Sequence, residues 1–237
     1  MSASSLTILS LDSSTEACSV ALLAENETVH QRFMLAPREH TQKILPTINE
    51  VVKEAGLALS DIDAIIYGQG PGSFTGVRIG ISIAQGLAFG LDIKMVGVST
   101  LQAMAQQALD SNGSESVYAA IDARMGEVYF AHYKNENGLM VLAGKEVVIK
   151  PEDLITSIVK TDIIKDSELV GTGWEAYLFL QEYFANCTLS DIIYPNAVNM
   201  LKSGKTLITK GQAVEPELAV PVYLRDTVTW KKLPGRE

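Results

Sequence analysis

A short unit that occurs twice is the feature that most constrains the fold. An apolar run ends at Asp12 (LSLD), and another ends at Asp122 (AAID), 110 residues later. Each is followed by a turn-prone stretch and a second β-like run, Ala17–Leu23 in the first half and Glu127–Tyr133 in the second. Such self-similarity indicates a duplicated domain. The chain is therefore predicted to be an α/β protein with two related halves.

Hydrophobic periodicity and turn residues predict the remaining elements. After a third strand near Val29–Phe33, the first half is expected to contain a helix ending at Gly56 with Pro46 inside it, a strand at Ala64–Tyr67, a helix at Phe74–Leu91 capped by Ser73, a strand at Met95–Val98 and a helix near Leu101–Leu109. The second half is expected to contain a strand near Val141–Ile149, a short helix from Pro151, a strand at Glu168–Val170, and helices at Trp174–Phe184 and Asn196–Ile208. The first half thus reads β-β-β-α-β-α-β-α.

A polar stretch, Asp110–Ser116, is typical of a connection between domains. We therefore expect one domain at 1–109 and a smaller one at 114–237, whose last helix or tail can pack back on the first. With 237 residues, 47% of them hydrophobic, each half can bury a core.

Composition and charge restrict the surroundings in which the chain works. No basic segment precedes the apolar run Leu6–Leu11, and no run reaches the roughly 18–20 apolar residues that span a bilayer, so a cytoplasmic protein without a membrane segment is predicted. Cys18 and Cys187 are expected to be free thiols. The 28 acidic residues outnumber the 19 scattered basic ones, so any RNA is expected to be contacted through another subunit.

Duplicated domains that open with a strand, an aspartate and a hairpin resemble the actin, Hsp70 and sugar-kinase superfamily (ASKHA, ribonuclease H-like). The resemblance implies a nucleotide cleft in which Asp12 and Asp122 flank phosphate and Mg²⁺. Here Ser13 and Ser14 stand where a glycine would let the backbone approach phosphate, and Arg124 stands in the second loop. We expect both loops to be vestigial phosphate loops. The alternative is that each aspartate only stabilises its turn.

A glycine-rich segment, GQGPGSFTGVRIG at Gly68–Gly80, follows the predicted fourth strand. It lacks the lysine of a Walker P-loop and does not follow the GxGxxG spacing. Two interpretations stay open. Its backbone N–H groups could hold an anion, or its glycines could only let the helix pack closely.

This segment, together with LSLDSSTEACSVAL, HTQKILPTINEVVKEAGLALSDIDAI, DARMGEVY and PVYLR, resembles the bacterial TsaB (YeaZ) family over nearly the whole chain. The resemblance implies a non-catalytic scaffold that activates TsaD, with TsaE as a further partner. The product is the threonylcarbamoyl group on the adenosine adjacent to the anticodon of tRNAs that read codons beginning with adenine. ATP and metal then belong to the partner subunits, a nucleotide at a subunit interface is left open, and tRNA is bound only through the complex.

No catalytic residue and no metal site are predicted in this chain. TsaD holds its metal through an HxxxH pair, and Thr100 and Met104 stand at those positions here. His30, His40 and His132 show no ligand spacing and are expected at the surface or in turns. Because neither HExxH nor GxSxG occurs, protease activity is rejected. The alternative function is a stand-alone small-molecule kinase or ATPase, which nucleotide turnover by the pure chain would reveal.

The resemblance also implies that the helices at 40–55 and 74–91 pair either with TsaD or with a second copy, so that homodimer and heterodimer exclude each other. Small residues recur every fourth position from Gly76 to Ala88 and form a ridge on which another helix could pack. The predicted interface comprises Ile44, Ile48, Val51, Gly76, Gly80, Ile83, Ala84 and Leu87. The alternative is that the ridge packs wholly against the chain's own first helix.

Overall fold

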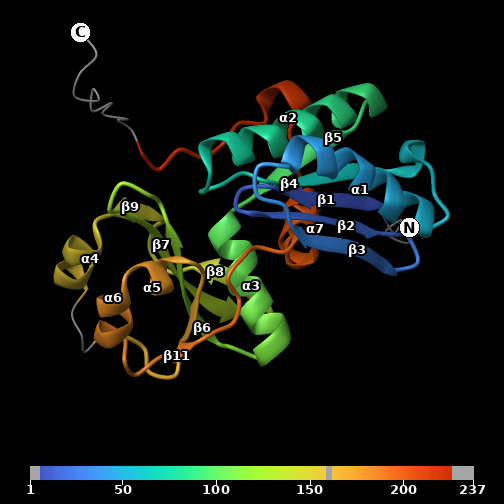
Figure 1. The fold of residues 1–237 in the computed structure, drawn as a ribbon. Coiled ribbons are helices and arrows are strands. Elements are labelled where there is room, and N and C mark those ends of the chain that lie inside the picture. Colours follow the sequence, from blue (N-terminus) through green and yellow to red (C-terminus); the bar gives the residue numbers. More distant parts are fainter. Residues whose placement is uncertain (1–5, 159–161, 226–237) are drawn as a thin grey trace, which may run out of the picture.

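The computed structural model describes residues 6–158 and 162–225 and contains two β-sheets, each with its own helices (Figure 1). The first half comprises β1 (Ile8–Asp12), β2 (Ala17–Leu23), β3 (Val29–Leu35), α1 (His40–Glu54), the 3₁₀ turn η1 (Leu59–Asp61), β4 (Ala64–Gly68), α2 (Phe74–Leu91), β5 (Lys94–Val98) and α3 (Thr100–Asn112). The predicted order β-β-β-α-β-α-β-α is confirmed, because strand and helix periods are distinct in this half.

The first lobe is the sheet β3-β2-β1-β4-β5 with the helices that cover it. β1, β2 and β3 form an antiparallel meander, and β4 and β5 continue it in parallel. Because successive strand residues point to opposite faces, Leu9 and Leu11 pack with the apolar side chains of α1 and α2, whereas Ile8 and Ile66 pack on the other face.

The second lobe repeats this plan around the sheet β11-β10-β6-β7-β8, with β9 also paired to β7. Its elements, followed by the C-terminal ones, are β6 (Ser116–Asp122), β7 (Val128–Glu136), β8 (Leu139–Leu142), β9 (Val147–Ile149), α4 (Pro151–Ser157), β10 (Glu168–Val170), α5 (Gly173–Ala176), α6 (Leu178–Tyr183), β11 (Thr188–Leu189), η3 (Ala197–Met200), α7 (Leu201–Thr209) and η4 (Pro216–Leu218). β6 pairs antiparallel with β7 and parallel with β10, as β1 does with β2 and β4. The predicted duplication is thus confirmed.

Several element limits differ from the sequence prediction. The expected strand 141–149 is two strands separated by a turn at Gly144, whose φ is 107°. The expected helix 174–184 breaks at Tyr177, which has a non-helical backbone. Of the expected connection 110–116, residues 110–112 form the end of α3, Gly113 caps the helix in the left-handed conformation that glycine adopts readily, and Ser116 begins β6.

Helix α3 and the C-terminal elements join the two lobes. Leu101 and Met104 of α3 lie in the second lobe's core, whereas Ala103 packs with residues of the first sheet. The η3–α7 segment returns from the second lobe and covers the open face of the first (Figure 1). The limits 1–109 and 114–237 stay a prediction, and residues 226–237 lie outside the described part of the chain.

One described helix, α2, is long and apolar enough to pass a composition test for a membrane span. Buried core helices pass the same test. Val77, Ile81 and Ala84 of α2 pack against the first sheet, so we interpret its hydrophobicity as that of a core helix with one further apolar face.

Candidate functional site

A cavity of about 1210 Å³ lies between the lobes. The β1–β2 turn contributes Thr15 and Glu16, the β6–β7 turn contributes Asp122 and Arg124, and the start of α2 contributes Ser73. The duplicated hairpins therefore face each other across one cleft, in line with the arrangement that the resemblance to the actin, Hsp70 and sugar-kinase superfamily implies.

The Asp12 side chain lies inside the first lobe, where it accepts hydrogen bonds from Ser14. Its Oδ1 accepts hydrogen bonds from the Ser14 backbone N–H at 2.9 Å and from Ser14 Oγ at 2.8 Å. Thr100 Oγ1 in turn donates to Ser14 Oγ at 3.0 Å. Asp12 is 1% exposed, so its carboxylate does not line the cleft. Burial raises the pKa of Asp12 from 3.8 to about 6.

The raised pKa makes stability depend on pH. Between 3.8 and about 6 the folded chain binds more protons than the unfolded chain, so the free energy of unfolding falls as pH rises through that window. Asp12→Asn keeps an oxygen that accepts from Ser14 and removes the titration. We measure the free energy of unfolding by urea denaturation at several pH values. From about pH 4 to about pH 7, we expect that of the parent to fall by roughly 2–3 kcal/mol relative to that of the variant. Parallel pH profiles of the two proteins would contradict this expectation.

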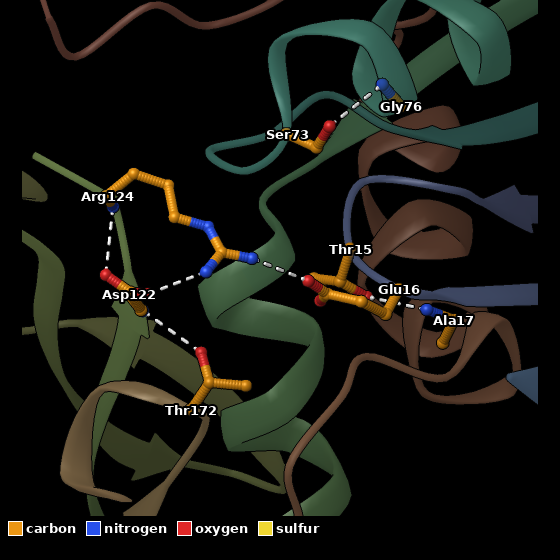
Figure 2. A network of polar contacts seen from close by, with 8 residues as sticks. All are labelled: Thr15, Glu16, Ala17, Ser73, Gly76, Asp122, Arg124 and Thr172. Carbon is orange, nitrogen blue, oxygen red and sulfur yellow. Dashed lines mark hydrogen bonds and ion pairs between the residues drawn. The ribbon is translucent and has the colours of Figure 1, made fainter. Parts of the chain in front are cut away.

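The second loop repeats the turn geometry of the first. The Arg124 backbone N–H donates to Asp122 Oδ1 at 2.9 Å, just as Ser14 does to Asp12. Arg124 Nη1 lies 3.3 Å from Asp122 Oδ2, and Nη2 reaches across the cleft to Glu16 Oε1 at 3.0 Å (Figure 2). The Asp122 N–H donates to Thr172 Oγ1 at 3.0 Å. Each aspartate thus stabilises its own turn, the alternative that the sequence left open.

The glycine-rich segment packs directly against the first hairpin turn. A Cβ on Gly72 would lie 2.2 Å from the Ser14 carbonyl oxygen, and one on Gly76 would lie 2.2 Å from that of Ser13. Ser73 N–H donates to the Ser14 carbonyl at 2.7 Å, and Ser73 Oγ accepts from Gly76 N–H at 3.2 Å (Figure 2). These contacts favour the interpretation that the glycines permit close packing.

The structure places most of the predicted interface inside the chain. Six of its members are buried in the monomer, namely Ile44, Ile48, Val51, Gly76, Gly80 and Ala84. Ile83 and Leu87 are half-buried. The small-residue ridge therefore faces the chain's own hairpin turn and sheet. A four-residue spacing identifies a helix face, but it does not say which way that face points.

The outward side of α2 continues from Ile83 and Leu87 to exposed residues. Phe89 is 77% exposed, Ser82, Gly86 and Gly90 are exposed beside it, and Leu45 on α1 is 44% exposed. The sequence indicates this further apolar face, because no charged residue occurs between Arg78 and Asp92.

Two of the three histidines are not surface or turn residues, so that expectation was wrong for them. His40 begins α1 and is buried, with Nε2 3.1 Å from the Ala17 carbonyl oxygen. His132 lies in β7, stacks on Tyr118 with ring centroids 4.3 Å apart, and contacts Ser116 Oγ at 2.9 Å. Burial lowers the pKa of His132 to about 4.

The metal and cysteine predictions concern residues that the structure describes. Thr100 and Met104, at the positions of the expected HxxxH pair, are both fully buried. Residues 6–158 and 162–225 contain no group of three His, Cys, Asp or Glu side chains that could hold a metal ion. Cys18 and Cys187 are free thiols, as predicted.

Comparisons with known proteins match this chain over nearly its whole length. A family model described as TsaD, tRNA N6-adenosine threonylcarbamoyltransferase, matches residues 23–232. The tRNA threonylcarbamoyladenosine biosynthesis protein TsaB of Escherichia coli is 49% identical and covers 97% of this chain and 99% of its own length. TsaB of Haemophilus influenzae is 46% identical and covers 98% of this chain and 99% of its own length.

Solved structures give the same result. YeaZ from Pseudomonas aeruginosa is 43% identical and superposes with a TM-score of 0.82, covering 92% of this chain and 100% of its own. The two-lobed α/β fold predicted from the repeated hairpin is therefore shared with a known structure.

Proposed function

Because the chain belongs to the TsaB family of tRNA threonylcarbamoyladenosine biosynthesis proteins, we propose that it acts in that biosynthesis as a non-catalytic scaffold. Its role is to bind and activate TsaD, with TsaE as a further partner. The complex then forms the threonylcarbamoyl group on the adenosine adjacent to the anticodon of tRNAs that read codons beginning with adenine. We place this function in the cytoplasm.

The observation that carries the non-catalytic role is the state of the two aspartate loops. Asp12 is buried and bound to Ser14, and Asp122 is bound to Arg124 and held by Thr172. The Asp12 carboxylate is buried away from the cleft, and the Asp122 carboxylate, which does line it, is paired with Arg124, whereas a magnesium-dependent phosphotransferase requires carboxylates that face a hydrated cation. This arrangement favours the scaffold over the stand-alone kinase or ATPase.

The partner surface that we propose is the outward side of α2 and the adjoining part of α1. Ile83, Leu87 and Phe89 supply apolar contacts, while Gly86 and Gly90 have open space where a side chain would stand. Small residues between apolar ones let a second helix approach closely. TsaD and a second copy of the chain would compete for this one surface.

Charge supports an indirect contact with tRNA. The formal net charge is −9, and protein affinity for nucleic acid depends on the number of phosphates neutralised by Lys and Arg. The positively charged surface that binds tRNA is therefore assigned to the partners.

Reconstitution tests the function. TsaD and TsaE with tRNA, ATP and an activated donor of the threonylcarbamoyl group are expected to modify tRNA at least tenfold faster when this chain is added. Mass spectrometry of the digested tRNA measures the product. The chain alone is expected to hydrolyse no ATP and to leave tRNA unshifted in a gel. ATP turnover by the chain alone, or unchanged modification on its addition, would contradict the proposal.

A further inference from the structure

The segment Ala219–Arg225 starts on the first lobe and ends on the second. Gln85 Nε2 of α2 donates to the carbonyl oxygens of Pro216 at 2.9 Å and Ala219 at 3.1 Å. The Val222 N–H donates to the Gln69 carbonyl at 2.9 Å. The bonds to Ala219 and from Val222 attach the segment to the first lobe, and the bond to Pro216 holds the residues just before it.

Arg225 attaches the end of the segment to the β6–β7 turn. Its Nε and Nη2 donate to Glu127 Oε2 at 3.0 and 2.5 Å, and Nη2 also donates to the Ala123 carbonyl at 3.1 Å. The two side chains are only 20% and 28% exposed. A forked, partly buried guanidinium–carboxylate pair is stronger than an exposed one, because solvent screens it less.

A second bridge crosses the cleft from the same turn. Arg124 reaches Glu16 of the first hairpin at 3.0 Å, with side chains that are 74% and 42% exposed (Figure 2). The turn itself runs through three successive residues with positive φ, Arg124 at 60°, Met125 at 58° and Gly126 at 78°. Two of the three are not glycine, and surrounding contacts must hold such a backbone in place.

We propose that Ala219–Arg225 and the turn Ala123–Glu127 form an interlobe latch that fixes the angle between the lobes. The lobes are joined on the other side of the cleft by α3, whose two faces pack in the two cores. With the latch engaged, contacts connect the lobes on both sides of the cleft. With the latch removed, α3 serves as the hinge and the cleft opens. This inference goes beyond the scaffold role, because it concerns the free chain and needs no partner.

The two bridges are expected to contribute unequally. Arg225 carries the larger share, since its contacts are forked and half-buried. Arg124 carries the smaller share, because water screens an exposed ion pair and leaves it weak.

Distance measurement by electron-electron double resonance tests the latch. Spin labels are placed at Thr75→Cys on α2 and Asp153→Cys on α4, both exposed, in the full chain carrying Cys187→Ser. Labelled chain is diluted with excess unlabelled chain, so that only distances within one molecule are recorded. Arg225→Ala is expected to broaden the distance distribution and extend it to longer values, Arg124→Ala to do so slightly, and Arg225→Lys to give an intermediate result.

Arg32→Ala is the matched control, since Arg32 pairs with Glu50 and Glu54 of α1, both within the first lobe. Its distribution is expected to equal that of the parent. Circular dichroism verifies that each variant is folded, and if Arg225→Ala does not fold, Glu127→Ala replaces it. A distribution unchanged in the folded Arg124→Ala/Arg225→Ala double variant, or in folded Glu127→Ala, would overturn the latch and leave α3 and η3 as the elements that fix the lobes.

Discussion

Replacing Ile83 and Leu87 together by aspartate is expected to abolish binding of the chain to TsaD. Both side chains are half-buried on the outward side of α2, between the exposed Phe89 and Ser82. A charge placed there must lose water when a partner covers it, and α2 itself offers no countercharge between Arg78 and Asp92. Each single substitution is expected to weaken binding at least tenfold, about 1.4 kcal/mol, and the pair more than a hundredfold.

Titration calorimetry with purified TsaD measures this loss, and sedimentation measures the homodimer in parallel. If the proposed surface serves both partners, the two affinities are expected to fall together. Leu178→Asp is the matched control: Leu178 is 65% exposed but lies on α6 of the second lobe. Full TsaD affinity in the folded double variant would place the interface elsewhere.

Substitutions at Ile48 or Ala84 would not test this surface. Ile48 is 1% exposed and Ala84 is fully buried, so Ile48→Asp or Ala84→Trp would disrupt the first lobe itself. Loss of binding in such variants would report unfolding. Ile83 and Leu87 pack only partly against the first lobe's core, and circular dichroism verifies that their aspartate variants are folded before binding is measured.

The sequence predicted an element correctly where residues close to it in the chain determine its limits. Ser73 caps α2, and the helix spans Phe74–Leu91 as expected, because the capping hydrogen bond to Gly76 lies within one turn. The repeat of Asp12 and Asp122 predicted two equivalent turns, and both accept the same backbone hydrogen bond.

Features that depend on contacts distant in sequence were not predictable in this way. The direction of the ridge from Gly76 to Ala88 depends on where the β1–β2 turn lies, more than sixty residues earlier. The bridges from Arg225 to Glu127 and from Arg124 to Glu16 join residues about a hundred positions apart. The motif PVYLR, which ends at Arg225, can be recognised in the sequence. Hydrophobic periodicity, however, does not show which residue Arg225 contacts.

Gly76→Ala is expected to lower the free energy of unfolding by roughly 3 kcal/mol or more, the upper range for overpacking a tight interior. The added Cβ would lie 2.2 Å from the Ser13 carbonyl oxygen, which is backbone and cannot rotate away. Ser13 Oγ also donates to the Gly76 carbonyl at 2.9 Å, so the turn and the helix are held together at this point. Either the helix shifts away from the turn, and this hydrogen bond weakens, or the turn distorts.

Gly86→Ala is the control in the same helix. A Cβ at Gly86 meets nothing within 4 Å, so only helix propensity changes, and we expect a gain of about 0.5–1 kcal/mol. Both glycines have helical backbones, so propensity favours alanine equally at the two positions and the difference between the variants measures the steric term. Urea denaturation of the dilute chain, followed by circular dichroism, gives both values. Equal stabilisation by the two substitutions would show that α2 does not need the close approach to the first hairpin turn, and the glycine-rich segment would then require another explanation, such as anion binding by its free N–H groups.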